Sequence, residues 1–197
     1  KGDGAFHTFS VDEVRGTLAS VRFPLGAIGA DIFILPYPRR YGLESAAGPQ
    51  LILLAPGVRP LSREQQHAEF THELGHVVQY ALMPDADAAG WGRYRALRGI
   101  GDDAIYAETS PHADRPHEIF AEDFRALFGD PLATYSGTIE NARIAAPGSV
   151  RGLADFMLGL AGIGGPVPAL AASPNPARGA LSFGVRGARL APPDVFD

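Results

Sequence analysis

The chain has 197 residues, of which 46% are hydrophobic and 20% are charged, and its formal net charge is −5. This composition is typical of a globular protein, and no cluster of Lys and Arg indicates binding to nucleic acid or to an anionic membrane. No apolar run is long enough to span a bilayer. Because the chain contains no Cys, disulfides and Cys-ligated zinc are excluded, and any metal must be held by His, Asp or Glu.

The first sixty residues predict mixed secondary structure. Ser10 is expected to cap a short helix over residues 11–20. Two apolar runs bounded by Gly and Pro, 31–35 and 50–54, predict short strands. Residues 36–40, which lie between them, are expected to form a turn or loop.

A long helix is predicted to begin after Ser62 and to end near Met83. Ser62 and Gln65 have the spacing of a capping box, and Pro84 follows the end of the helix. A second helix is predicted over residues 86–98. Its inward side chains are expected to be Trp91, Tyr94 and Leu97.

The remaining chain predicts a long loop and two further helices. Residues 99–115 are polar without a regular pattern, and a loop of this length is more often functional than not. A helix is predicted over 116–128, with Pro116 in its first turn and Gly129 at its end. Another is predicted over 149–161.

These elements predict an α+β fold with a small mixed sheet and a helical carboxyl-terminal half. Residues 1–161 are expected to form this domain. Residues 162–197 are expected to be a Gly/Pro-rich linker, up to about residue 179, and a truncated tail with at most one or two strands.

The most informative motif is His72-Glu73-Leu74-Gly75-His76, inside the predicted long helix. Imidazoles four residues apart lie on one helical face, so both can reach one metal ion, and Glu73 beside them can accept a proton from a water activated by that ion. Gly75 costs a helix about 1 kcal/mol relative to Ala. We therefore expect a close approach there, to another backbone.

A third ligand completes a catalytic zinc site. The extended pattern H-E-x-x-H-x-x-G-x-x-H fails, because Gln79 and Leu82 occupy its Gly and last His positions. Glu118 and Glu122 offer another route, since they share one face of the helix 116–128. Glu118 is expected to bind the metal, and Glu122 to accept the N–H of a ligating imidazole.

The motif at 72–76, followed by E-I-F-A-E-D-F-R at 118–125, resembles the gluzincin metallopeptidases. Within this family the chain is most similar to the group of the anthrax lethal factor catalytic domain and the Pro-Pro endopeptidases, over roughly residues 60–130. The resemblance implies a zincin-like domain whose edge strand binds extended substrate. It also implies that His72, His76 and Glu118 are the zinc ligands. By the same resemblance, Glu73 is the general base and Glu122 orients one of the ligands.

One position departs from this family, whose members place an oxyanion-stabilising tyrosine two helical turns before the third ligand. Here that position is Pro111. Tyr106 is the nearest tyrosine upstream and is the predicted catalytic donor. His112 and His117 are alternatives, because an imidazole can also donate a hydrogen bond to an oxyanion.

The tail resembles the opening of bacterial secretion-sorting domains. Its Pro174-Asn175-Pro176 run precedes Ala180-Leu181-Ser182-Phe183, as a P-N-P run precedes the first strand of such domains. The alternative is a Pro-rich linker. The resemblance implies an exported enzyme, secreted or held at the cell surface. The chain begins at Lys1 without a signal-peptide pattern, so we expect a processed product.

The sequence thus predicts a zinc endopeptidase that acts on peptide or protein substrates. The strand near 51–54 is expected to be either the edge that pairs with an extended peptide or a buried central strand. Two other functions remain open, namely an inactive zinc-binding module and a zinc hydrolase of non-peptide amides. Substrate specificity and oligomeric state are not legible in the sequence.

Overall fold

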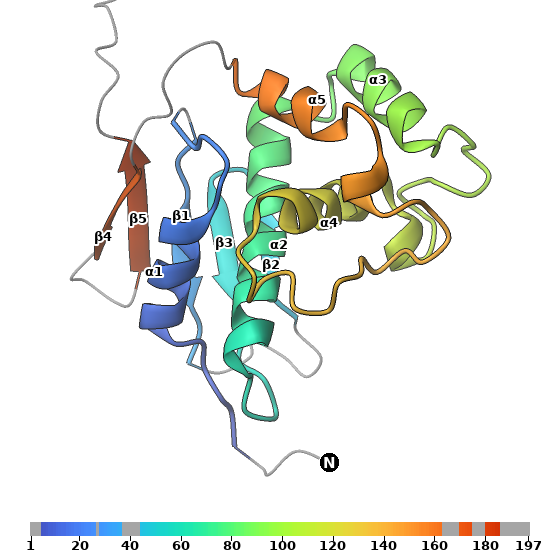
Figure 1. Ribbon diagram of the computed structural model, residues 1–197. Coiled ribbons are helices and arrows are strands. Elements are labelled where there is room, and N and C mark those ends of the chain that lie inside the picture. Colours follow the sequence, from blue (N-terminus) through green and yellow to red (C-terminus); the bar gives the residue numbers. More distant parts are fainter. Residues whose placement is uncertain (1–4, 27, 37–43, 163–169, 175–179, 186–197) are drawn as a thin grey trace, which may run out of the picture.

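The computed structural model describes residues 5–26, 28–36, 44–162, 170–174 and 180–185, and it has a mixed α+β fold (Figure 1). Its helices are α1 (Val11–Ser20), α2 (Arg63–Leu82), α3 (Ala88–Arg98), α4 (Pro116–Phe128) and α5 (Leu153–Leu160), with short 3₁₀ helices at His112–Asp114 and Pro147–Ser149. Its strands are β1 (Asp31–Ile34), β2 (Ala46–Gly48), β3 (Leu51–Leu54), β4 (Leu170–Pro174) and β5 (Ala180–Val185). Within these residues no helix has the length and apolar character that crossing a membrane requires.

The strands form one mixed sheet in the order β2-β3-β1-β5-β4. β1 pairs with β3 in parallel, whereas β2–β3, β1–β5 and β4–β5 are antiparallel pairs. β3 is therefore an interior strand, as one of the two sequence interpretations had it, and the expected edge role of 51–54 is wrong. The edge on this side of the sheet is β2.

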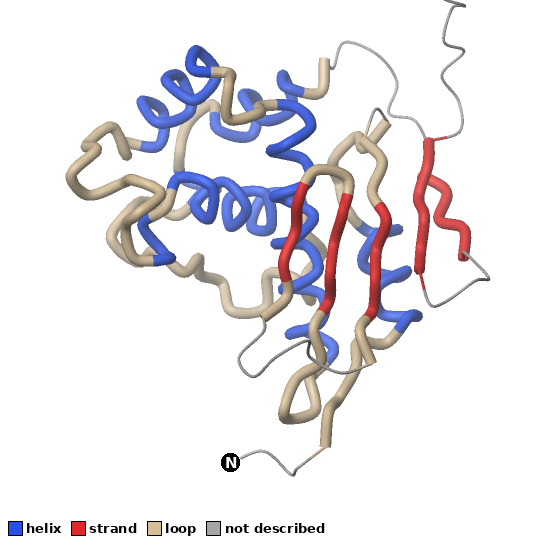
Figure 2. Tube along the Cα trace, turned by 180° about the vertical axis from the view of Figure 1, so that it is seen from behind, coloured by secondary structure: helices blue, strands red, loops and turns tan. Residues whose placement is uncertain are grey.

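The helices gather on one side of the sheet, and the view from behind shows the strands in front of them (Figure 2). The core forms between the two layers, where Ile32 of β1 and Ile52 and Leu54 of β3 are fully buried. Phe70 and Leu74 of α2 belong to the same buried cluster. Alternate strand residues are buried because strand side chains point to opposite faces.

The cap predicted at the start of α2 is confirmed. The Ser62 side chain accepts from the Gln65 N–H, and the Gln65 side chain accepts from the Ser62 N–H. α1 is likewise capped by Ser10, which accepts from the Glu13 N–H. These local bonds satisfy amide donors that a helix start leaves without partners.

α2 and α4 pack closely where Gly75 faces Ala121, as the helix-interior glycine predicted. A Cβ atom at Gly75 would lie 2.9 Å from the Ala121 Cα and 3.0 Å from its carbonyl oxygen. No side chain fits in that space. The small residues bring the His-bearing face of α2 within side-chain reach of the acidic face of α4.

A buried ionic cluster fixes α3 against α4. The Arg98 Nε lies 2.8 Å from the Asp123 Oδ2, both side chains are fully buried, and the Tyr94 hydroxyl donates to the same oxygen at 2.7 Å. The sequence did not mark Arg98 as a core residue. Removing Arg98 or Asp123 would leave an uncompensated buried charge, so the pair disfavours any packing of α3 and α4 that separates the two side chains.

A second histidine of α2, His67, joins three segments. Its Nδ1 lies 2.8 Å from the Asp130 Oδ2 and its Nε2 lies 2.9 Å from the Glu13 Oε2. Asp130 follows α4 and Glu13 belongs to α1, so this buried imidazole fastens both to α2. We call His67, Glu13 and Asp130 the clasp.

The tail differs from the expected linker. Residues 162–179 contain β4, and β5 joins the sheet by pairing with β1. Residues 175–179, which include most of the P-N-P run, lie outside the described residues. Two of the predicted helices begin later than expected. α3 begins at Ala88, not at residue 86, and α5 begins at Leu153, not at residue 149, since 3₁₀ and turn residues precede α5.

Candidate metal centre

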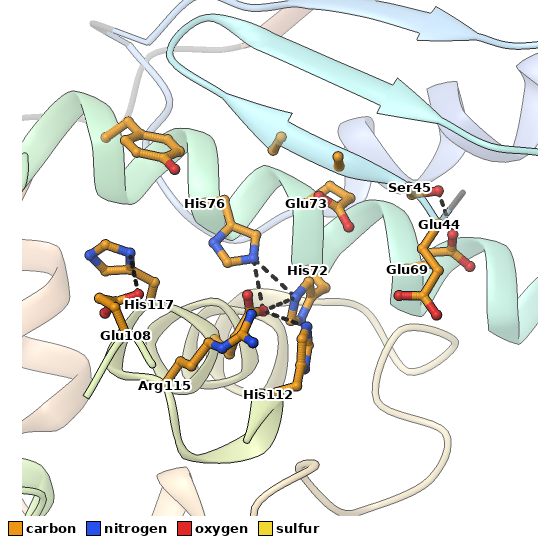
Figure 3. A pocket seen from close by; sticks show the side chains of 14 residues that line it. Glu44, Ser45, Glu69, His72, Glu73, His76, Glu108, His112, Arg115 and His117 are labelled. Atoms are coloured by element: carbon orange, nitrogen blue, oxygen red, sulfur yellow. Dashed lines mark hydrogen bonds and ion pairs between the residues drawn. The ribbon is translucent and has the colours of Figure 1, made fainter. Parts of the chain in front are cut away.

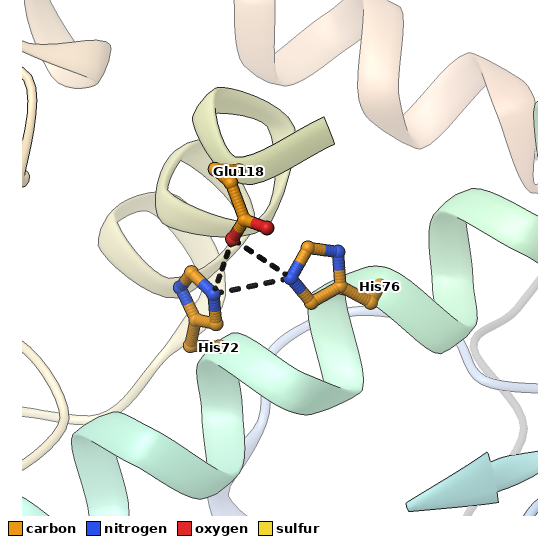
Figure 4. Close-up of side chains that lie close together, drawn as sticks. All are labelled: His72, His76 and Glu118. Atoms are coloured by element: carbon orange, nitrogen blue, oxygen red, sulfur yellow. Dashed lines mark hydrogen bonds and ion pairs between the residues drawn. The ribbon is translucent and has the colours of Figure 1, made fainter. Parts of the chain in front are cut away.

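Three side chains from two helices converge on one point (Figure 4). The Nε2 atoms of His72 and His76 each lie 3.1 Å from the Glu118 Oε2 and 3.1 Å from one another. The three side chains are 12–15% exposed. Among the residues that the structure describes, this is the one group of His and acidic side chains with ligand atoms close enough to share an ion.

The arrangement fits Zn²⁺. Two imidazole nitrogens and one carboxylate oxygen are a donor set of catalytic zinc sites. Ligand atoms at the corners of a zinc tetrahedron lie about 3.3 Å apart, given bonds of about 2.0–2.1 Å. The distances of 3.1 Å between the three ligand atoms match that spacing.

Glu122 fixes the orientation of His72. Its Oε1 lies 2.9 Å from the His72 Nδ1, which leaves the His72 Nε2 directed at the site. Arg125 donates to both Glu122 oxygens, at 2.9 and 2.7 Å, and the Glu140 N–H donates to the Oε2 at 2.9 Å. An imidazole held in this way offers the lone pair of its other nitrogen to a metal.

The carboxylates stabilise positive charge at the centre. Burial alone would lower the pKa of His72, but its bonds to Glu118 and Glu122 outweigh that effect and raise the pKa to about 10. Burial likewise opposes ionisation of Glu118, yet the two histidines hold its pKa well below the usual range. A bound cation can supply the same charge in place of the proton on His72.

Glu73 lines the same cleft and is buried, with 7% of its surface exposed. No hydrogen bond holds its carboxylate in the described part of the chain. Burial raises the pKa of Glu73 to about 7, against the opposing charge of His72. A carboxylate with this pKa can both accept and release a proton near neutral pH.

These groups line a cleft of about 540 Å³ between α2, α4 and β2 (Figure 3). Ala46 and Ala47 of the edge strand β2 form one wall. The side chains that line the rest of the cleft are Glu44, Ser45, Glu69, His72, Glu73, His76, Tyr80, Glu108, His112, Arg115, His117 and Glu118.

The three candidate oxyanion donors lie in different surroundings. Tyr106 is 8% exposed and belongs to the hydrophobic core, so it does not line the cleft. His112 and His117 do line it. The ring nitrogens of His117 lie 3.3 Å from Asp85 and 3.3 Å from Glu108, whereas the His112 Nε2 lies 3.3 Å from the Glu118 Oε2.

Sequence reasoning missed several residues at this site. Tyr80 lies one helical turn beyond His76, so its position on the His-bearing face of α2 could have been found by spacing. Arg115 precedes Glu118 by one turn but lies before α4, where no periodic pattern extends. Glu140 lies in an irregular segment, and only the folded chain brings it to Glu122.

The chain matches no protein-family model, no curated protein and no solved structure. Its candidate site therefore rests on the residues and their geometry.

Proposed function

We propose that this protein is a zinc-dependent endopeptidase. The observation that carries the proposal is the cleft, in which a His-His-Glu ligand set lies beside a buried carboxylate without a hydrogen-bond partner in the described residues. A purely structural zinc site has its coordination closed by protein ligands, whereas a catalytic site has three ligands and an open position. Glu73 supports the catalytic alternative, since a structural site needs no base.

His72, His76 and Glu118 would hold the ion, and Glu122 with Arg125 would keep His72 in its binding orientation. When bound, Zn²⁺ supplies Lewis-acid polarisation of the substrate carbonyl and acidifies the attacking water. Glu73 accepts the proton from that water and later delivers it to the leaving amine.

The position of β2 supports the proposal that the substrate is a peptide. It is three residues long, it ends the sheet on this side, and Ala46 and Ala47 border the cleft. An extended peptide can add to such an edge through main-chain hydrogen bonds, which tolerate many side chains. Ala46 is exposed and Ala47 and Gly48 are half-buried, which agrees with the edge position of β2.

The test is cleavage of a diverse peptide library by purified protein, with products mapped by mass spectrometry. We expect interior peptide bonds to be cut, the activity to vanish after chelation and to return with Zn²⁺. Hydrolysis of small amides alone would favour the non-peptide hydrolase. Zinc binding without any hydrolysis would favour the inactive module.

A further inference from the structure

The cleft contains a cationic side chain that the zinc ligands and the base do not account for. Arg115 is the last residue before α4, and it lines the cleft together with His72, His76 and Glu118. Figure 3 shows its side chain extending into the cleft, with the guanidinium directed towards His72 and His76. An arginine is not deprotonated in a protein. The cleft therefore holds a permanent positive charge beside the proposed metal centre.

A single hydrogen bond holds the Arg115 guanidinium and leaves its terminal nitrogens without a partner. The Arg115 Nε donates to the Ser110 carbonyl oxygen at 3.0 Å. Among the residues that the structure describes, no acceptor is bonded to the two terminal nitrogens. Glu108 and Glu118 line the same cleft, but neither forms an ion pair with the guanidinium. The terminal N–H groups are therefore available to an acceptor that enters the cleft.

The loop before α4 holds the carbonyl that fixes this arginine. The Ser110 hydroxyl donates to the Ile105 carbonyl at 2.7 Å and accepts from the Ala107 N–H at 3.0 Å. Arg95 of α3 donates to the Tyr106 carbonyl at 2.9 Å, and the Tyr106 side chain lies in the core. These bonds tie the loop to the helices, which is the support that a catalytic group requires.

From this geometry we propose that Arg115 is a catalytic residue, whose terminal guanidinium nitrogens donate hydrogen bonds to the substrate carbonyl oxygen as negative charge develops there. A charged donor forms stronger hydrogen bonds than a neutral one, and its effect on the rate comes from the charge that the oxygen gains in the transition state. The inference rests on the proposed peptidase function. It assigns to Arg115 the role that the sequence gave to Tyr106.

Other donors in the cleft are less suited to this role. Both ring nitrogens of His117 lie 3.3 Å from carboxylates. The His112 Nδ1 lies 2.8 Å from the Glu140 Oε2, and a neutral ring that donates there has only an acceptor at its other nitrogen. The Tyr80 hydroxyl is the main rival, because it lines the cleft and has no hydrogen bond in the described residues, but it carries no positive charge.

The first experiment compares the kinetics of zinc-loaded Arg115→Gln, Arg115→Lys and Tyr80→Phe with those of wild type. We expect Arg115→Gln to lower kcat about 100-fold or more, with KM within about threefold and zinc content unchanged, since loss of one oxyanion donor costs about 10²–10³-fold. Arg115→Lys keeps the charge but not the planar fork of donors, so we expect a loss of about tenfold. Arg93→Gln is the matched control, because Arg93 is exposed on α3 and does not line the cleft.

A second readout does not require turnover. It is the affinity of a phosphinic peptide, a tetrahedral anion that imitates the charge of the transition state, measured by calorimetry. We expect Arg115→Gln to weaken this binding about 100-fold. Binding of the uncharged parent peptide, measured in a Glu73→Gln background, should change less than about threefold when Arg115→Gln is added, because the ground-state carbonyl carries little charge.

Three results would overturn the inference while chelation and Glu73→Gln still abolish hydrolysis, which leaves the proposed function standing. The first is a kcat and a phosphinic affinity of Arg115→Gln that both stay within threefold of wild type. The second is a raised KM with an unchanged kcat, since Arg115 would then bind the substrate and its transition state equally. The third is a larger loss of kcat in Tyr80→Phe than in Arg115→Gln. If chelation and Glu73→Gln leave hydrolysis unchanged, the proposed function falls and the inference falls with it.

Discussion

Two histidines of α2, five residues apart, are each held between two carboxylates, yet their surroundings differ. His67 is 3% exposed and lies between Glu13 and Asp130 in the clasp. His72 lies between Glu118 and Glu122, but a second imidazole faces it and a cleft opens beside it. A pair of carboxylates around an imidazole is therefore not itself a metal site. The second imidazole and the open cleft distinguish His72, the proposed ligand, from His67, which has a structural role.

The largest difference between the two histidines is expected when each is removed in turn. His72→Ala should weaken Zn²⁺ binding at least about 100-fold, since one ligand contributes roughly 3 kcal/mol of a zinc site's total. His67→Ala should retain one zinc per chain and lose about 2 kcal/mol of unfolding free energy, because two half-buried carboxylates lose a hydrogen-bond partner. Metal titration and urea unfolding measure the two effects. Similar metal loss in both variants would refute the distinction.

The next largest effect is expected from removing the contact by which Glu122 orients His72. Glu122→Gln removes the charge that faces the His72 Nδ1 and Arg125, so Zn²⁺ affinity should fall about 10- to 100-fold. Competition with a chromophoric chelator measures the affinity. If the affinity stays within twofold of wild type, Glu122 does not tune the ligand.

Close packing of α2 on α4 is tested at Gly75. Gly75→Ala places a methyl group against the Ala121 backbone, and we expect a net loss of about 2 kcal/mol, since overpacking exceeds the helix-propensity gain of about 1 kcal/mol. Gly92→Ala in α3 is the matched control, because its added Cβ meets no atom within 4 Å. Thermal unfolding should show opposite signs in the two variants. Stabilisation by both substitutions would contradict the close approach.

The smallest expected effect is the change in the stabilising contribution of the clasp with pH. Bonds to Arg63 and His67 lower the pKa of Glu13, and bonds from Ala133, His67 and Ser20 outweigh burial and lower the pKa of Asp130. A carboxyl group whose pKa is lower in the folded state than in the unfolded state, where it is about 4, stabilises the fold at pH values above about 4. This contribution is lost as pH falls through the lowered values.

Urea unfolding of wild type and His67→Ala at pH 7 and below pH 4 tests this prediction. The wild type should lose more unfolding free energy on acidification than the variant, because the variant lacks the part of each pKa lowering that His67 causes. Equal losses would show that the clasp does not contribute to the acid response.

The sequence predicted the features that local patterns encode. The capping box of Ser62 and Gln65, the extent of α2 and α4 and the close approach at Gly75 are confirmed. Helical spacing placed His72 with His76, and Glu118 with Glu122, on one face of each helix. The meeting of the two faces was an expectation of the metal-site hypothesis, and the structure brings the three side chains together.

The features that the sequence did not predict depend on contacts between residues that are far apart in the chain. β3 is rich in Leu and Ile whether it is central or at an edge, so only strand order shows that β2 is the edge. Tyr106 lies in an irregular loop, where no periodicity tells whether a side chain faces the cleft or the core. Glu140 and Arg98 act through partners that only the folded chain brings near.

The central claim is that the motif at His72–His76 together with Glu118 forms a catalytic zinc centre. The most direct measurement is zinc content and peptide hydrolysis of Glu73→Gln beside wild type. We predict one zinc per chain in both proteins and a loss of hydrolysis of at least about 100-fold in the variant, since general-base catalysis contributes about 10²–10⁴-fold. Equal hydrolysis by the two proteins, or wild-type protein that binds no zinc, would contradict the account.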